Sequence, residues 1–527
     1  MEEIILKNLK KGICFVLSIA MLSAAVAGCN TNKSASSEPE EGKRYTITWA
    51  ADITDPEATE MAQYYEEKLN IDLELWAVPN TEALNLRLAA GEIPDRFSID
   101  GFSAFNKYCK QGLLAEIPAE SLEKYAPTLS TIYKEDYPNT PGALEYAKMD
   151  GKIMALPDLN YDTKFRTAIA YRGDWMQNLG VEKTPETLAD FEKLMYQFTN
   201  EDPDKNGEKD TYGISQSGMN VVYGAYGFQV GGFANVEDTW IKDGDKLVYG
   251  PVTPDAKEAL ATLRKWYADG VLDPEFITGE NTGGYWPISH SFINGRIGCT
   301  ARGAFYHYRP AFEGVEQGGP VYLEFKKINP EAAEAMKMGV PPVGTTGKRG
   351  IFKWNMLIMG IGIGKQVEEE PGKLEKMLEF MDYIVQDLDH FKTAHYGIEG
   401  KDWKADNEYG LPEKIGDVDW KDIGAGGTFF SVIPPRYKEA LKYPAYNDWT
   451  YNNEFDKYGI NNELMTSLPS EQRYTVELKK IQEEAYLSII TGKQPVDYFD
   501  EFVKNWYASG GEQQTKEANE WYSSIQK

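Results

Sequence analysis

Oxygen-bearing side chains recur at alternate positions between residues 202 and 210 and could bind a metal ion. The segment reads Asp202-Pro-Asp204-Lys-Asn206-Gly207-Glu208-Lys-Asp210. Carboxylate and amide oxygens fall at the first, third, fifth and ninth positions of a loop, and glycine at the sixth permits a tight turn. The Glu208 carbonyl would add a backbone ligand. This alternation predicts a structural Ca²⁺ site, although position twelve is Gly213 and not the bidentate glutamate of an EF-hand. The alternative is an acidic, solvated turn without an ion.

Cys29 is a second residue with distinctive chemistry. It follows Val26-Ala-Gly at the end of an apolar run, and Lys7, Lys10 and Lys11 precede that run. A basic start and a short apolar run rich in small residues are typical of a secretory signal peptide, not of a membrane span. Small residues directly before cysteine resemble a bacterial lipobox. We therefore expect residues 1–28 to be removed and Cys29 to carry diacylglycerol, with acyl chains such as palmitate. The alternative is an ordinary secretory signal or a weak N-terminal anchor.

Composition excludes several functional classes. The chain of 527 residues has a formal charge of −27, and no basic cluster follows the leader, so nucleic acid is not an expected partner. No second long apolar run follows the leader. Cys109 and Cys299 stand in unrelated contexts and are expected to be separate buried thiols, although an exported protein could join them in a disulfide. No zinc motif is formed by the histidines, which are His290, His307, His390 and His395.

The order of expected elements indicates an α/β protein. Residues 29–44 are polar and predict a flexible tether. Strand and helix patterns then alternate, which favours helices packed on a sheet. Strands are expected at 45–49 and 71–78, and helices at 56–69, 81–90, 187–199, 254–269 and 372–387, with a largely helical tail over 472–526 interrupted near 491–493 and 509–511. The length is too great for one core and predicts two lobes.

Several short segments together resemble one protein family. They are Leu86–Asp95, Gln111–Ile117, Asp150–Pro157, Asp174–Thr187, Gly270–Phe276 and Phe292–Phe305. In order and spacing they resemble the extracellular solute-binding lipoproteins of ABC importers, of the family 1 type that includes alginate- and maltose-binding proteins. The resemblance implies a periplasmic-binding-protein-like clamp, in which two discontinuous α/β lobes are joined by crossing segments. The first lobe would comprise 45–157 and 340–395, and the second 160–335 and 400–527.

The same resemblance implies a function. The protein would be a monomer on the outer face of the cytoplasmic membrane, anchored through Cys29. It would capture an oligosaccharide by lobe closure and deliver it to the permease subunits of an ABC transporter. Alginate-binding relatives close their calcium loop with an acidic residue where this chain has Thr211, so water or the Thr211 hydroxyl would complete the site.

Candidate ligand contacts combine flat aromatic rings with polar side chains, because sugars present C–H faces and hydroxyl edges. The resemblance implies contacts from Asp100, Asp158, Asn160, Arg302 and Phe305. Loop-like surroundings add three tryptophans, which are Trp286, Trp354 and Trp403.

Three other functions remain open at the level of sequence. The same clamp could bind a peptide, a lipid-linked precursor or another solute, since the fold alone does not determine the ligand. It could sense a ligand for a signalling partner. A secreted glycosidase is the least favoured, because catalysis needs two carboxylates in a defined geometry and the sequence singles out no such pair. Gly213–Gly218 does not have the G-x-S-x-G spacing of a nucleophile elbow. We therefore expect no enzyme.

Overall fold

The structure is a computed structural model that describes residues 38–51, 60–231, 237–280, 284–312, 318–426 and 436–526. The predicted signal peptide, Cys29 and the first part of the tether lie outside the described residues. None of the helices within these ranges combines the length and the apolar character that crossing a membrane requires.

In the part of the chain that the structure describes, the first sheet combines four strands from residues 45–159 with one strand from residues 357–363. Its strands are, in spatial order, β2 (Ile71–Ala77), β1 (Tyr45–Ala51), β3 (Arg96–Ser98), β14 (Leu357–Ile363) and β6 (Leu156–Leu159). Strand β1 runs parallel to β2 and β3, and β14 runs antiparallel to β3 and β6. Tyr45, Ile47 and Trp49 alternate into the core along β1, as a strand period of two requires.

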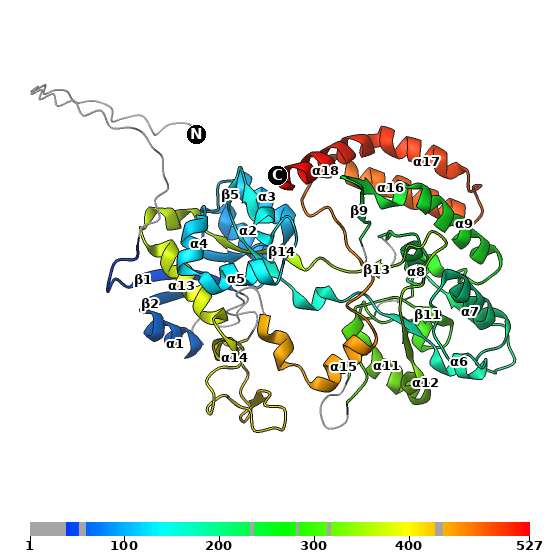
Figure 1. The fold of residues 1–527 in the computed structure, drawn as a ribbon, viewed down its shortest axis with the longest axis horizontal. Coiled ribbons are helices and arrows are strands. Elements are labelled where there is room, and N and C mark those ends of the chain that lie inside the picture. The colour runs from blue at the N-terminus through cyan, green and yellow to red at the C-terminus, as the bar shows by residue number, and fades with distance from the viewer. Residues whose placement is uncertain are drawn as a thin grey trace, which may run out of the picture. The chain divides into compact units, whose positions relative to one another are not determined.

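Helices surround this sheet (Figure 1), and α13 packs against α4, α5 and β1. The helices are α1 (Glu60–Leu69), α2 (Thr81–Ala89), α3 (Gly101–Lys110), α4 (Ala119–Tyr125), α5 (Pro127–Glu135), α13 (Lys373–Val385) and α14 (Leu388–Tyr396). The helices predicted near 81–90 and 372–387 are confirmed as α2 and α13.

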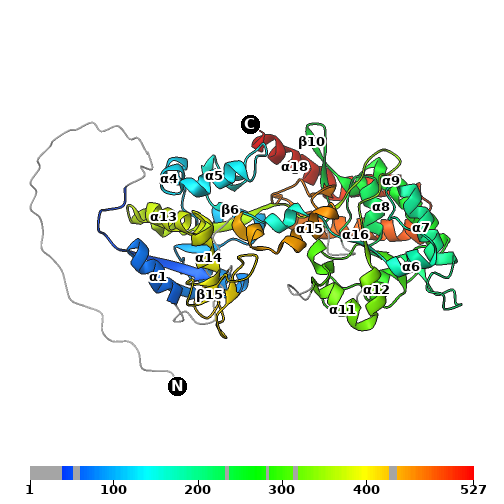
Figure 2. The same cartoon turned by 60° about the horizontal axis from the view of Figure 1, so that its bottom comes forward.

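The second sheet has the order β12 (Lys337–Gly339), β7 (Ile169–Tyr171), β11 (Ile297–Thr300) and β8 (Tyr212–Ile214). Its surroundings are mostly helical (Figure 2). The helices are α6 (Gly173–Asn178), α7 (Leu188–Asn200), α8 (Met219–Ala225), α9 (Pro254–Ala268), α10 (His290–Ile293), α11 (Pro320–Ile328), α12 (Pro330–Ala335), α15 (Pro444–Asn452), α16 (Glu471–Ile490), α17 (Tyr498–Trp506) and α18 (Glu512–Ile525).

Helix α7 shows how the local sequence sets these elements. The Thr187 hydroxyl caps the helix by accepting a hydrogen bond from the Asp190 amide at 3.1 Å. Phe191, Met195 and Phe198 lie on one face and are fully buried. The predicted helices 187–199 and 254–269 are thus confirmed as α7 and α9.

Two crossing segments within the described residues connect the first sheet with the second. Strand β6 leads through a 3₁₀ turn (Tyr161–Lys164) to β7. Strand β12 leads through β13 (Ile351–Phe352) to β14, and β13 pairs in parallel with β17 (Gly459–Ile460). The remaining short strands pair as hairpins: β4 (Lys148–Met149) with β5 (Lys152–Ile153), β9 (Trp240–Asp243) with β10 (Lys246–Tyr249), and β15 (Trp403–Lys404) with β16 (Glu413–Lys414). This is the predicted fold class, two α/β lobes made of discontinuous sequence.

The lobe boundaries remain a proposal, and core packing favours one change. Ile398, Trp420, Ile423 and Ala425 pack in the core cluster of the first sheet. We therefore assign residues 400–425 to the first lobe instead of the second. Cys109 and Cys299 form no disulfide, as predicted; Cys299 is buried, whereas Cys109 is only half-buried.

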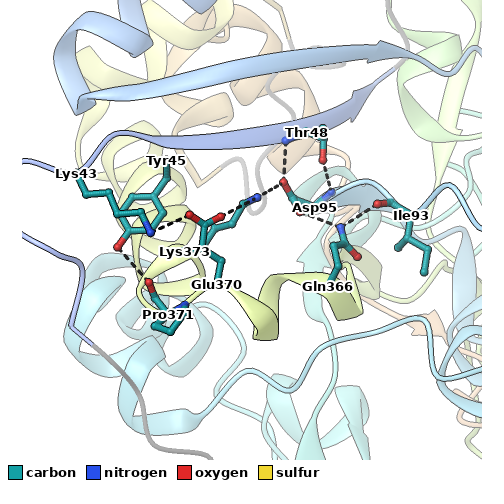
Figure 3. A network of polar contacts seen from close by, with 9 residues as sticks. All are labelled: Lys43, Tyr45, Thr48, Ile93, Asp95, Gln366, Glu370, Pro371 and Lys373. Atoms are coloured by element: carbon teal, nitrogen blue, oxygen red, sulfur yellow. Dashed lines mark hydrogen bonds and ion pairs between the residues drawn. The ribbon is translucent and has the colours of Figure 1, made fainter. Parts of the chain in front are cut away.

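A buried polar network fixes the turn before β3 to the start of α13 (Figure 3). The Asp95 carboxylate accepts hydrogen bonds from the Thr48 amide at 2.9 Å and from Gln366 Nε2 at 2.8 Å. It also pairs with Lys373 Nζ at 2.8 Å, and both of these side chains are largely buried. At the edge of the network, Glu370 pairs with Lys43 at 2.9 Å. The network joins segments that are almost 300 residues apart and so holds the first lobe together.

Candidate functional site

Two cavities meet at Ile358 of β14. The first has a volume of about 470 Å³ and lies at the carboxyl ends of the parallel strands β1, β2 and β3. Its wall includes Ala51, Asn80 and Asp100, which come from the ends of these strands or the turns after them. Ligands bind at this edge of α/β sheets because the loops there converge. The predicted contacts Asp100 and Asp158 both line this cavity.

Asp158 is suited to accept a hydrogen bond from a ligand. Its Oδ1 atom is buried and has no hydrogen-bond partner within the protein. Burial raises the pKa of this carboxyl to about 6, against the opposing effects of the Leu159 amide and Lys438. Asp100 directly precedes α3 without capping it through its side chain, and its Oδ2 accepts a hydrogen bond from the Thr81 hydroxyl at 3.3 Å. An unsatisfied buried acceptor is costly, so a ligand hydroxyl reaching Asp158 would relieve that cost.

The second cavity has a volume of about 510 Å³ and combines aromatic rings with amide side chains. Four predicted contacts line it: Asn160, Trp286, Phe305 and Trp354. Trp354 is held edge-on against Phe352, with ring centroids 5.1 Å apart, and Trp286 is held edge-on against His307 at 5.2 Å. Both tryptophans are half-buried, so each has a supported ring and an accessible part. Such fixed rings can stack on sugar C–H faces.

Phe305 and Tyr306 have different roles in this cavity. Phe305 is only 1% exposed, and its ring packs on Phe165 with centroids 4.6 Å apart. Tyr306 follows it in the same 3₁₀ turn (Phe305–Tyr308) and is 37% exposed. The prediction of Phe305 as a stacking ring therefore needs correction, because Tyr306 presents the accessible ring.

The geometry also argues against Arg302 and Trp403. Neither residue belongs to the lining of the two cavities. The Arg302 guanidinium donates from Nε to the Trp286 carbonyl at 2.5 Å and so supports the backbone of that loop. Trp403 is 3% exposed and donates from Nε1 to the Gly397 carbonyl at 2.8 Å. We leave both out of the candidate site.

Two further cavities continue the second one. A third, of about 510 Å³, shares Asp162 and Tyr306 with it, and a fourth, of about 330 Å³, shares Glu237, Asn462 and Leu464. Each of the other three cavities shares one or more lining residues with the second, and we call the four neighbouring cavities the binding groove. A groove of this extent has room for a ligand of several linked units, with rings and polar groups along its course.

Two asparagines of the groove, Asn355 and Asn462, were not predicted from the sequence. Asn355 donates from Nδ2 to the Asn462 carbonyl at 2.8 Å, and Asn462 Oδ1 accepts a hydrogen bond from the Trp240 amide at 3.1 Å. These three residues meet only through the fold, so no local spacing could have identified them. Tyr306 could have been found from its place beside the predicted Phe305.

The acidic loop of residues 202–210 is folded but not arranged as a finished metal site. Asn206 Nδ2 lies 3.0 Å from Asp204 Oδ2 and 3.3 Å from both Asp210 carboxylate oxygens. Asp204 Oδ1 is buried and has no hydrogen-bond partner, so this oxygen could act as a cation ligand. Across the described residues, no group of three or more acidic, histidine or cysteine side chains is arranged to hold a metal ion. The Asn206 amide donates hydrogen bonds to the Asp204 and Asp210 carboxylates, which would otherwise face one another.

Thr211 does not contribute to this loop through its side chain. It is buried, and its hydroxyl donates to the Phe198 carbonyl at 2.8 Å. The predicted Thr211 ligand is therefore removed from the candidate set, because its hydroxyl faces the end of α7.

No family model matches the chain. The polygalacturonan/rhamnogalacturonan-binding protein YtcQ of Bacillus subtilis (strain 168) is 24% identical over 96% of this chain and 98% of its own length. Lipoprotein LipO of the same organism is 22% identical over the same shares. The fructooligosaccharide ABC transporter substrate-binding protein FusA of Streptococcus pneumoniae is 26% identical over 50% of this chain and 53% of its own length.

Solved structures show the same fold. An extracellular solute-binding protein from Bifidobacterium longum subsp. infantis has a TM-score of 0.64 at 13% identity, covering 93% of this chain and 100% of its own. The alginate-binding protein AlgQ2 without calcium ion has a TM-score of 0.55 at 17% identity, covering 91% and 98%. An EF-hand mutant of FusA in complex with fructo-nystose has a TM-score of 0.57 at 17% identity, covering 92% and 99%. The chain thus has the fold of extracellular solute-binding proteins, and it resembles the carbohydrate-binding members in sequence.

Proposed function

We propose that this protein is the extracellular substrate-binding component of an ABC importer and that its substrate is an oligosaccharide. The binding groove carries this proposal, because accessible rings and amide side chains from both lobes line its neighbouring cavities. Closing the lobes on a sugar would bring both walls into contact with it, so ligand binding would shift the protein toward the closed form. Permease subunits would recognise that form.

The anchor follows from the same proposal. Lipid on Cys29 and a tether over residues 29–44 would keep a monomeric clamp at the outer face of the cytoplasmic membrane, close to its permease. Sequence relatives that include a lipoprotein and binding proteins support this role. We propose binding and delivery without catalysis, because the groove supplies hydrogen bonds and stacking surfaces to an intact ligand.

A calcium ion would have a structural role in the second lobe. Its ligands would be side-chain oxygens of Asp202, Asp204, Asn206 and Asp210 and the Glu208 carbonyl. The orphaned Asp204 oxygen supports the fit, and the Asn206 amide would turn to present its oxygen. Bound calcium would neutralise the carboxylates and pin the loop to the end of α7.

Intrinsic fluorescence tests the proposal, because two tryptophans line the second cavity. The purified protein would be titrated with a panel of neutral and acidic oligosaccharides. We expect a saturable change with at least one of them, and we expect the Trp286→Ala, Trp354→Ala double variant to lose it. Trp76→Ala is the matched control, since Trp76 is half-buried in β2 and does not line the binding groove. An unchanged response in the double variant would remove both rings from the site.

A further inference from the structure

The third cavity of the binding groove differs from the others in charge. Its lining contains three cationic side chains, Arg309, Lys438 and Lys442, against one carboxylate, Asp162. The other lining residues are uncharged: Tyr306, Leu441, Tyr443 and Tyr446. The described lining therefore has a net charge of +2 within a chain of formal charge −27. A local excess of positive charge in a concave site attracts anions, despite the opposite charge of the whole protein.

The cations converge on a small region. Lys438 Nζ lies 2.8 Å from Asp162 Oδ2, and Lys442 Nζ lies 2.7 Å from Asp162 Oδ1. Arg309 Cζ and Lys442 Nζ lie 4.9 Å and 5.1 Å from the centroid of the same Tyr446 ring. An ammonium group has three donors, and the bond to Asp162 uses one of them on each lysine. Donors remain for a second anion beside the tyrosine rings.

The turn that carries Lys438 has a further anchor besides the lysines. The 3₁₀ turn that carries Lys438 (Arg436–Leu441) is fastened by Arg436, whose guanidinium pairs with Asp136 at 2.5 Å and Glu135 at 2.9 Å at the end of α5. The negative charge of the Asp162 carboxylate would be neutralised by a single lysine. Both lysines pair with Asp162, so the second lysine adds a positive charge that this carboxylate does not neutralise, which favours a role in binding.

We propose that the third cavity is a subsite for an acidic sugar unit, with the ligand carboxylate bound by Lys438, Lys442 and Arg309 and the ring face lying against Tyr306. This assignment rests on the proposed function and names its substrate class as an oligosaccharide that carries carboxylates. Asp162 orients the two ammonium groups and accepts hydrogen bonds from sugar hydroxyls. Charge-assisted hydrogen bonds give such a subsite selectivity for the acid over its neutral ester.

A pair of probes of equal size tests the subsite by isothermal titration calorimetry: trigalacturonate and its methyl ester. The acid should bind roughly tenfold or more tightly than the ester, and added salt should reduce that difference. Lys438→Gln should lower affinity for the acid by a larger factor than it lowers affinity for the ester, because only the acid loses a charge-assisted hydrogen bond. Lys326→Gln is the matched control, because Lys326 is a similarly exposed lysine in an ion pair with Glu334 outside the groove.

The outcomes separate this inference from the proposed function. Equal affinity for acid and ester, or an equal loss of both in Lys438→Gln, would overturn the acidic subsite. Binding of neutral oligosaccharides alone would overturn the subsite and leave the proposed function standing. Failure of every saccharide to bind would overturn both. A thermal melt of each variant ensures that the comparison is made between folded proteins.

Discussion

Replacing Asp95 with alanine should destabilise the first lobe strongly. The substitution removes the carboxylate that accepts from Thr48 and Gln366 and pairs with Lys373, whose side chain is only 12% exposed. Breaking a buried ion pair from one side costs about 3–5 kcal/mol, and Lys373 would keep only its longer contact with Glu370, at 3.6 Å. For a cooperative unit the size of one lobe, this corresponds to a fall in melting temperature of roughly 10 °C.

Differential scanning calorimetry and guanidinium unfolding would measure this loss. Glu370→Ala is the matched control at the edge of the same network (Figure 3), where Glu370 is 38% exposed and pairs with Lys43. It should cost at most about 1 kcal/mol, as exposed ion pairs do. Adding Lys373→Met to Asp95→Ala should restore part of the loss, because it removes a largely buried charge that has lost its nearer partner. An Asp95→Ala protein within about 1 kcal/mol of the wild type would refute the reasoning that this network holds the lobe together.

Three further predictions concern the metal loop, pH and the groove. Chelation should lower the melting temperature of the wild type but not of Asp204→Ala, and equal shifts in the two proteins would contradict a calcium site in this loop. Burial in the folded state raises the pKa of Asp158 from 3.8 to about 6, so the folded protein binds this proton more tightly than the unfolded chain does. The contribution of Asp158 to the free energy of unfolding should therefore fall as the pH rises between these values. Urea unfolding of Asp158→Asn over this pH range should show a flatter dependence on pH than the wild type. Tyr306→Ala should weaken oligosaccharide binding in a calorimetric titration with little effect on the melting temperature, whereas Phe305→Ala should cost about 3–5 kcal/mol of stability because it empties a core position.

Local patterns in the sequence predicted much of the secondary structure. Phe191, Met195 and Phe198 follow the helical period, so α7 could be placed from the sequence alone. The break expected near 509–511 is present at Gly510, whose φ of 127° leaves the helical region. The two-lobe fold could be predicted because several short segments resemble those of a known family in order and spacing.

The candidate site was less predictable because side-chain exposure depends on tertiary packing. Phe305 and Tyr306 are adjacent and both aromatic, yet only the fold decides which ring is covered by Phe165. Trp403 occupies a loop-like stretch of sequence, but a hydrogen bond to Gly397 holds it in the core. The cationic subsite joins Arg309 to Lys438 and Lys442, more than a hundred residues later, so no sequence motif could have indicated it.

We propose that the binding groove holds one oligosaccharide along its length. Calorimetric titration of the purified protein with a chain-length series of a single glycan tests this claim most directly. We expect one ligand per protein and an affinity that rises from the monosaccharide through the longer oligomers until the binding groove is filled. An affinity for the monosaccharide that equals the affinity for the longer oligomers would contradict this proposal. So would the absence of binding by every member of both a neutral and an acidic glycan series.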